Sequence, residues 1–512
     1  MAIRKVCGLE TEYGIILRGA DSNPITVSSL LINAYVSALA RQATAAESGD
    51  KASAATNKVG WDFEDESPGR DARGFAREGA MAPEIETHLV NAVLTNGARY
   101  YVDHAHPEYS SPECSDAMEA VLWDKAGERI LARSIEAAAE VLPAGQEIVV
   151  YKNNSDRKGN SYGCHENYLL DRALPFARLA AQITPHFVSR QIYTGAGKVG
   201  SEAAGISSGR VPFQLTQRAE FFEEEVGLET TLKRPLVNTR DEPHSDSSKY
   251  RRLHVIVGDA NLAEISTFLK VGVTALVLAM IEDDELAGLD LTLAGSVQAH
   301  RTVSYDLTLA TPLELADGRR MTALEMQWEL LDRARKYAES RGLEAVGVDV
   351  GRDLLDRWEG VLHALETDYL SLAGQLDWVA KYQMVSAYRE RHSLAWNDPR
   401  LAALDLQYHD VRPGRSLYEK CGLERLLSEE AVVAAITNPP TTTRAYFRGR
   451  CLQKWAGSIA AANWDSLVFD LGTDPLRRVP MMEPLKGTAA HVDRLLQQCE
   501  TPAQLLEALG ST

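Results

Sequence analysis

The spacing of hydrophobic residues changes along the chain and predicts a mixture of helices and strands. Apolar side chains recur at helical spacing in four segments, residues 24–46, 117–141, 174–182 and 262–281. Strand-like patterns occupy residues 1–17, 96–109, 146–153 and 252–257. Shorter helices and strands follow, so we expect a large domain over residues 1–400 and a small C-terminal domain over residues 401–512.

Two polar stretches interrupt this pattern. Residues 47–60 are rich in Ala, Ser, Lys and Asp and contain few large apolar side chains, which is typical of a mobile segment. Residues 61–75 form a turn-rich piece whose aromatic side chains are spaced to anchor a loop, and we predict a mobile loop over about residues 41–81. The glycine-rich residues 195–209 predict a surface loop.

Composition narrows the class of protein. The 512 residues are 45% hydrophobic and 25% charged, and no run approaches the roughly 18 apolar residues of a membrane span. The N-terminus lacks the apolar stretch of a signal peptide, so we expect a cytoplasmic protein without a membrane partner. The net charge of −18 disfavours nucleic acid as a partner, and six cysteines without CxxC spacing argue against zinc or a disulfide framework.

The densest chemistry lies in residues 96–109. Side chains of a strand alternate between its faces, so Arg99, Tyr101 and Asp103 point the same way, and the following turn brings Glu108 close. A cation, a phenol and carboxylates on a buried face are costly unless they pair with one another, a metal or an anionic ligand. Asp103 is therefore either a structural partner of Arg99 or a catalytic residue.

Further polar residues recur at strand ends. Glu10 and Glu12 alternate on one strand, while His165 and His244 offer imidazole ligands. Carboxylates dominate, which favours Mg²⁺ or Mn²⁺ over zinc. Arginine suits phosphate oxygens, so the set indicates a nucleotide with a divalent metal; the arginines are Arg99, Arg240, Arg251 and Arg252. The chain contains no GxxxxGK[ST] loop or kinase signature, so the nucleotide-binding folds that carry these motifs are not supported.

Each of these signals has a simpler alternative. Alternating acids can be a solvated strand face, and single histidines are more often satisfied core residues, the class in which we place His104, His106 and His186. Trp61 and Phe63 are more often packing residues than ligand contacts, and residues 223–225, all Glu, are most simply a solvated helix face.

Longer motifs identify a family. The chain resembles, over nearly its whole length, the Pup ligases and Pup deamidase/depupylases, enzymes that act on Pup, the ubiquitin-like tag of a bacterial proteasomal degradation pathway. The motifs that carry the resemblance are Gly8-Leu9-Glu10-Thr11-Glu12-Tyr13-Gly14 and residues 96–109, 152–154, 161–168, 238–246, 250–259 and 406–410. The resemblance implies an α+β, glutamine-synthetase-like fold, in which a curved antiparallel sheet lined by helices cradles ATP and Mg²⁺ beside a small C-terminal domain.

Residues 61–75 favour one branch of this family. Depupylase-type members carry an extra loop with the signature Trp-Asp-[Phe/Tyr]-Glu-x-Glu-Ser-Pro-x-Arg-Asp-Ala-Arg-Gly-Phe, which these residues match in full. Residues 102–108 also resemble the depupylase form. The resemblance implies a hydrolase that cleaves the isopeptide bond between the C-terminal Glu side chain of Pup and a substrate lysine, and that deamidates a C-terminal Gln of Pup. Its partners would be Pup and pupylated proteins.

The resemblance also implies residue roles. Asp103 aligns with the essential aspartate of the family, which either attacks the amide carbon or activates the attacking group. Nucleotide contacts are implied for Gly8, Arg99, Ser111, Arg240, Arg252 and Trp464. Metal contacts are implied for Glu10, Tyr101, Glu108, His165 and His244. ATP would be a bound cofactor, since hydrolysis of an amide needs no ATP energy. Two alternatives stay open, an ATP-dependent Pup–protein ligase and a non-catalytic Pup-binding regulator.

Overall fold

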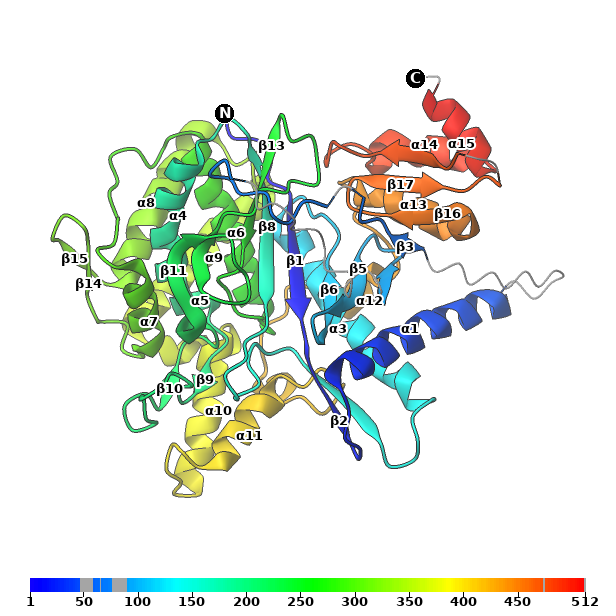
Figure 1. Ribbon diagram of the computed structural model, residues 1–512. Coiled ribbons are helices and arrows are strands. Elements are labelled where there is room, and N and C mark those ends of the chain that lie inside the picture. The colour runs from blue at the N-terminus through cyan, green and yellow to red at the C-terminus, as the bar shows by residue number, and fades with distance from the viewer. Residues whose placement is uncertain (47–58, 65, 76–89, 473–474, 511–512) are drawn as a thin grey trace.

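A six-stranded antiparallel sheet with the strand order β13-β8-β1-β6-β5-β4 forms the centre of the structure (Figure 1). The computed structural model describes residues 1–46, 59–64, 66–75, 90–472 and 475–510. The strands of the central sheet are β1 Cys7–Glu12, β4 Asn91–Val93, β5 Arg99–Asp103, β6 His106–Ser110, β8 Cys164–Asp171 and β13 Tyr250–Val255.

Alternating side chains give this sheet an apolar face and a polar face. In β1, Cys7 and Leu9 are buried in the core, whereas Glu10 and Glu12 lie half-buried on the other side. The apolar face packs in one hydrophobic core with helices α1 Pro24–Ala46, α3 Ala117–Ala139 and α6 Glu264–Glu282. Covering one face with helices leaves the opposite face for polar side chains.

Further elements surround this core. The remaining helices of the large core are α4 Phe176–Ser189, α5 Gln191–Thr194, α7 Ser296–Tyr305, α8 Ala323–Arg341, α9 Val348–Thr367, α10 Asp377–Arg391, α11 Pro399–Tyr408 and α12 Glu429–Ala435. Two-stranded sheets join β2 Gly14–Arg18 to β7 Glu147–Tyr151, β9 Lys198–Val199 to β10 Phe213–Gln214, β11 Phe222–Gly227 to β12 Arg234–Asn238, and β14 Leu313–Glu314 to β15 Arg320–Met321.

The helix predictions are confirmed, most closely for α1, which occupies the predicted residues. Two other predictions are wrong. Residues 223–225 belong to strand β11, where they are exposed as predicted but not helical. Residues 195–200 are buried, because β9 pairs with β10, so only the later part of residues 195–209 is a surface loop. The mobility predicted for residues 47–58 and 76–81 lies outside the described residues.

The sequence predicts no membrane span, and helix α6 is the element against which this prediction can be checked. It meets the length and hydropathy criteria for such a span over residues 264–282, and 100% of its most apolar window is buried inside the protein. Lys270 lies within it and donates to the carbonyl of Asp259 at 2.8 Å, so even its charged side chain is satisfied internally. These contacts are those of a core helix.

A second sheet lies towards the C-terminus, with the order β18-β17-β16-β3 (Figure 1). It joins β16 Ile459–Ala462, β17 Ser466–Phe469 and β18 Arg477–Pro480 to β3 Gly60–Trp61, which runs parallel to β16. Helices α13 Ala445–Trp455, α14 Ala489–Gln498 and α15 Pro502–Gly510 complete its hydrophobic cluster. Leu401 still packs in the large core, and the domain boundary at residue 401 stays a prediction.

Candidate active site

The polar face of the central sheet brings the predicted site residues together. Strand register places Glu10 opposite Ser110 on one side and His165 on the other, and places Tyr101 opposite Glu108. Residues directly opposite each other in antiparallel strands share a face. The side chains of four strands therefore meet over one surface.

Two adjoining pockets open on this surface, a cleft of about 370 Å³ and a narrower pocket of about 80 Å³. Both are lined by Glu10, His244, Arg252 and Trp464. The narrow pocket adds Gly8 and Ser111, and the cleft adds Arg99, Tyr101, Asp103, Glu108, His165 and Arg240. Every residue predicted for the site therefore lines at least one pocket, while the role of each residue stays a prediction.

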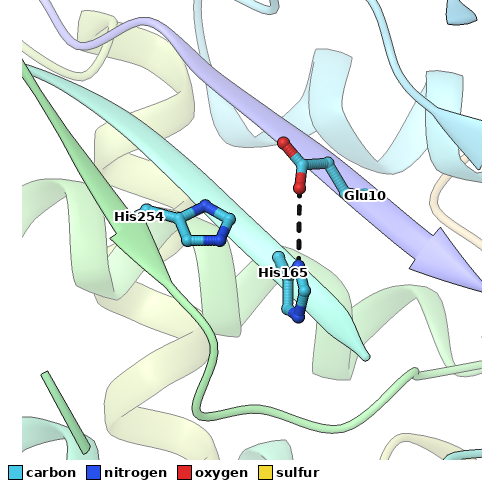
Figure 2. Close-up of side chains that lie close together, drawn as sticks. All are labelled: Glu10, His165 and His254. Atoms are coloured by element: carbon cyan, nitrogen blue, oxygen red, sulfur yellow. Dashed lines mark ion pairs between the residues drawn. The ribbon is translucent and has the colours of Figure 1, made fainter. Parts of the chain in front are cut away.

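Within the described part of the chain, two side-chain groups could hold a metal ion, and Glu10, His165 and His254 form the first of them (Figure 2). One ligand atom from each lies within 4.8 Å of the others, and Nδ1 of His165 is 3.4 Å from Oε2 of Glu10. Burial tends to raise the pKa of Glu10, but its contacts with His165, His254 and Arg252 lower that pKa well below its usual value. Glu10 is therefore held as a carboxylate.

Asn167 orients this first group. Its amide nitrogen donates to Oε1 of Glu10 at 2.8 Å, and its amide oxygen accepts from Arg252 at 2.6 Å and lies 3.1 Å from Nδ1 of His254. Nδ1 of His254 also lies 3.3 Å from Nη1 of Arg252, whereas Nε2 of His254 is buried without a hydrogen-bond partner among the described residues. Burial also lowers the pKa of His254 well below its usual value, so the ring is neutral and suited to bind a cation.

Glu12, Asp103 and Glu108 form the second group. Glu108 is 2% exposed, and burial, followed by repulsion from Asp103, Glu10 and Glu12, raises its pKa well above the usual value. Tyr101 donates a hydrogen bond to Oε1 of Glu108. Carboxylates this close together are destabilising without a positive charge, so a hard divalent cation such as Mg²⁺ fits this donor set.

His106 contacts the second group through Glu12. Its Nδ1 lies 3.3 Å from Oε2 of Glu12, and its ring packs on Tyr162 with the centroids 4.4 Å apart. Burial tends to raise the pKa of Glu12, but the contacts with His106 and with the N–H of Gly163 help to lower it to about 2. The prediction of a core histidine is wrong for His106, because the tight turn after β5 places it opposite Asp103.

The same turn gives Asp103 a neighbouring partner. His104 has a φ of 50°, and its Nδ1 lies 2.8 Å from Oδ2 of Asp103. Within the described residues no ion pair joins Asp103 to Arg99. The alternative that Asp103 is a structural partner of Arg99 is therefore wrong. The prediction of a core histidine is therefore wrong for His104 also, whereas His186 is buried and bonded to Thr274 as predicted.

Arg99 lies against aromatic rings. Its guanidinium carbon is 3.8 Å from the ring centroid of Tyr101 and 4.0 Å from that of Trp61. Trp61 in turn meets Trp464 edge to face, with the centroids 5.2 Å apart. Trp61 thus supports Arg99 from behind, while Phe63, Glu66, Pro68 and Gly69 line the cleft itself.

The basic side of the cleft is built around Glu242. Its carbonyl accepts from Nε of Arg252 at 2.6 Å, and its Oε2 lies 3.8 Å from Nε2 of His244. Burial lowers the pKa of His244 to about 4, and His244 belongs to neither metal-capable group found in the described residues. Nε of Arg240 is buried and has no hydrogen-bond partner among the described residues. This donor is therefore suited to bind an anionic ligand.

Sequence reasoning missed His254, Asn167 and the participation of His106. The available signal was periodicity, because His254 follows Arg252 by two positions on β13 and so shares its face. Strand pairing, which places His254 opposite Asn167, cannot be read from one strand alone.

The fold and this acidic, arginine-rimmed cleft define an α+β protein with a glutamine-synthetase-like architecture. The family model described as Pup-ligase protein matches residues 5–468, so the chain belongs to this family. The depupylase of Acidothermus cellulolyticus is 53% identical over 518 residues, with 99% of each chain covered. The Pup deamidase/depupylase of Mycobacterium tuberculosis is 46% identical over 520 residues, again with 99% of each chain covered. The Pup–protein ligase of Nocardioides sp. is 42% identical, over 79% of this chain and 90% of the ligase.

Solved structures agree with this assignment. The complex between Pup and its ligase PafA gives a TM-score of 0.79 at 32% identity, covering 99% of this chain and 94% of the solved chain. PafA in complex with ADP gives a TM-score of 0.71 at 38% identity, covering 80% of this chain and 89% of the other. The predicted family and fold class are therefore confirmed.

Proposed function

We propose that this chain is a Pup deamidase/depupylase. It hydrolyses the isopeptide bond between the C-terminal Glu side chain of Pup and a substrate lysine, and it deamidates a C-terminal Gln of Pup. The observation that carries the proposal is the match over 99% of the chain, at 46–53% identity, to proteins named depupylase or Pup deamidase/depupylase. The ligase relative covers 79% of the chain. The predicted hydrolase branch is thereby confirmed, while a cytoplasmic location stays a prediction.

ATP and Mg²⁺ are the cofactors we propose, and the residues present fit both. A similar ligase has been solved with ADP, and Arg99, Arg240 and Arg252 give this cleft the cations that phosphate oxygens require. Gly8 lines the narrow pocket without a side chain, which keeps that end open. When bound, Mg²⁺ supplies positive charge beside the reacting carbonyl, which the acids of the second group would otherwise oppose.

Asp103 is the residue we propose to carry the reaction. Its side chain is 25% exposed at the cleft, so an amide carbon can approach it. It attacks that carbon or removes a proton from the attacking group, and the hydrogen bond from His104 fixes one carboxylate oxygen. In both routes the C–N bond breaks, the amine leaves with a proton, and water supplies the oxygen of the new carboxylate.

The test is to incubate the full chain with Pup ending in Gln, and separately with a Pup–protein conjugate, in ATP and Mg²⁺, while ADP release is followed. We expect both substrates to be cleaved without stoichiometric ATP consumption. Asp103→Asn should abolish cleavage, whereas Asp349→Asn, which removes a 98% exposed carboxylate, should not. Failure of the wild type to cleave either substrate would contradict the proposal.

The same experiment tests the two alternatives. A ligase would form conjugate from Pup ending in Glu with one ADP released per bond, and the similarity to PafA is the observation that keeps this reading open. A non-catalytic Pup-binding regulator would retain its function in Asp103→Asn. Cleavage that is lost in this variant while Pup still binds would exclude the regulator.

A further inference from the structure

We propose that Trp61 is a positioning residue that holds the Arg99 guanidinium for the nucleotide, an inference that rests on the proposed nucleotide cofactor. Arg99 lies on β5 of the central sheet, whereas Trp61 lies on β3 of the C-terminal sheet. Their contact, 4.0 Å from the guanidinium carbon to the indole centroid, joins the two sheets at the cleft. Trp61 itself is absent from the lining of both pockets, so it acts through Arg99.

The contact uses the part of Arg99 that a phosphate does not need. Aromatic rings attract a guanidinium through its flat faces, while its N–H donors point outwards in the plane. Nε donates to Oδ1 of Asn91 at 2.8 Å, and the two terminal nitrogens have no hydrogen-bond partner among the described residues. Tyr101 and Trp61 therefore restrict the orientation of the guanidinium and leave its terminal donors for an anion.

Trp61 is itself held from three sides. Its backbone pairs with Ala462 of β16, its Nε1 donates to Oε1 of Glu66 at 2.6 Å, and its ring meets Trp464 at 5.2 Å. The residue is 7% exposed. A side chain with so little freedom can restrict a flexible arginine, which otherwise loses rotamer entropy when it binds a ligand. The affinity for the nucleotide should thus depend on a residue about 40 positions away from the strand that binds it.

The test measures ADP binding to the full chain by equilibrium dialysis in Mg²⁺. Trp61→Leu removes the aromatic face but keeps an apolar side chain, and we expect ADP affinity to fall roughly 3- to 30-fold, the range for one partly desolvated cation–π contact. Trp61→Phe keeps an aromatic face and should retain most of the affinity. Trp455→Leu is the matched control, because Trp455 is 8% exposed in the same C-terminal unit and does not contact Arg99.

A double-mutant cycle separates positioning from a general structural effect. Arg99→Met should weaken ADP binding, and Trp61→Leu added to Arg99→Met should cause little further loss, because the residue through which Trp61 acts is already gone. The inference would be overturned if the loss of ADP affinity in the double variant equalled the product of the fold-losses in the two single variants. Normal ADP affinity in Trp61→Leu would overturn it too. Absence of ADP binding to the wild type would overturn it as well.

These outcomes are distinct from failure of the proposed reaction. If the wild type binds ADP and shows the coupling but cleaves neither Pup substrate, the inference stands and the proposed function fails. If the wild type cleaves both substrates and the two losses multiply, only the inference fails.

Discussion

Nδ1 of His104 lies 2.8 Å from Oδ2 of Asp103, the residue before it in the chain. An ionised carboxylate only accepts hydrogen bonds, so the imidazole is the donor. The contact exists because His104 adopts a φ of 50°, which is unfavourable for most residues but is tolerated by Asn and Gly. Substitution of His104 can therefore separate the effect of its backbone conformation on Asp103 from the effect of its imidazole.

His104→Asn should retain most of the deamidation rate, because Asn accepts this backbone conformation and can donate to Asp103. His104→Gly keeps the conformation but has no donor, and we expect kcat to fall by about 10-fold or more with little change in KM, as for loss of one hydrogen bond to a charged group. The measurement is steady-state deamidation of Pup ending in Gln. Equal rates for the two variants would show that the imidazole does not orient Asp103.

Removal of divalent cations should destabilise the protein through the second acidic group. Without a cation, Glu12, Asp103 and Glu108 repel one another, so chelation should lower the Tm of the wild type. Glu108→Gln removes one of the carboxylates that can bind the cation and should reduce that Tm shift. Thermal unfolding with Mg²⁺ and with EDTA measures the effect, and Glu329→Gln, at an exposed position of helix α8, is the control. An unchanged shift in Glu108→Gln would argue against a cation at this group.

Asn167→Ala should weaken cation binding at the first group, although Asn167 belongs to neither metal-capable group. The substitution removes the hydrogen bonds that orient Glu10 and His254, and loss of such an orienting partner typically costs about 10- to 100-fold in metal affinity. Titration with Mn²⁺ followed by electron paramagnetic resonance gives the affinity. His254→Gln should weaken binding at the same site, whereas His363→Gln on helix α9 should leave it unchanged. Normal Mn²⁺ affinity in Asn167→Ala would remove the orienting role.

Glu113 should make the attachment of the C-terminal helices pH-dependent. Burial tends to raise its pKa, but Arg448 and Arg444 lower it from 4.5 to about 2. A lowered pKa in the folded state gives stability that is present above the unfolded pKa and is lost as the pH falls from about 5 to about 2. The difference of about 2.5 pKa units, at about 1.4 kcal/mol each, corresponds to about 3 kcal/mol at pH 7.

Glu113→Gln should therefore lower the unfolding free energy by up to about 3 kcal/mol at pH 7, and by less at pH 4. Urea denaturation at the two pH values measures the difference. Glu429→Gln is a matched control, because Glu429 also pairs with an arginine but is 43% exposed, so solvent screens the pair. A loss for Glu113→Gln that does not depend on pH would contradict the assignment.

The sequence predicted those parts of the site that follow from the period of a single strand. The shared face of Arg99, Tyr101 and Asp103 and the closeness of Glu108 required only alternation along β5 and one turn. The sequence did not predict the place of His254 in the site, because its contact with Glu10 and His165 depends on the order of strands β13, β8 and β1. Strand order is decided by long-range packing, which a local pattern does not record.

Prediction of the fold from the sequence has the same limit, because local patterns do not record long-range pairing. Helix α1 was predicted over its full length, because its apolar spacing is local. The exposed glutamates of residues 223–225 look like a helix face, but pairing with β12 makes them a strand. Nothing in residues 60–61 indicates a strand, since their pairing partner, β16, lies near the other end of the chain.

That pairing has a consequence for synthesis on the ribosome. Gly60 pairs with Ala461, so about 400 residues must be translated before β3 meets its partner. At roughly 5–20 residues per second this takes about 20–80 s. The central sheet, whose last strand ends at Val255, can form long before then, but Arg99 does not meet Trp61 in its paired strand until the C-terminal sheet has emerged. In an unfinished chain the acids of the cleft should therefore be assembled well before Trp61 restrains Arg99.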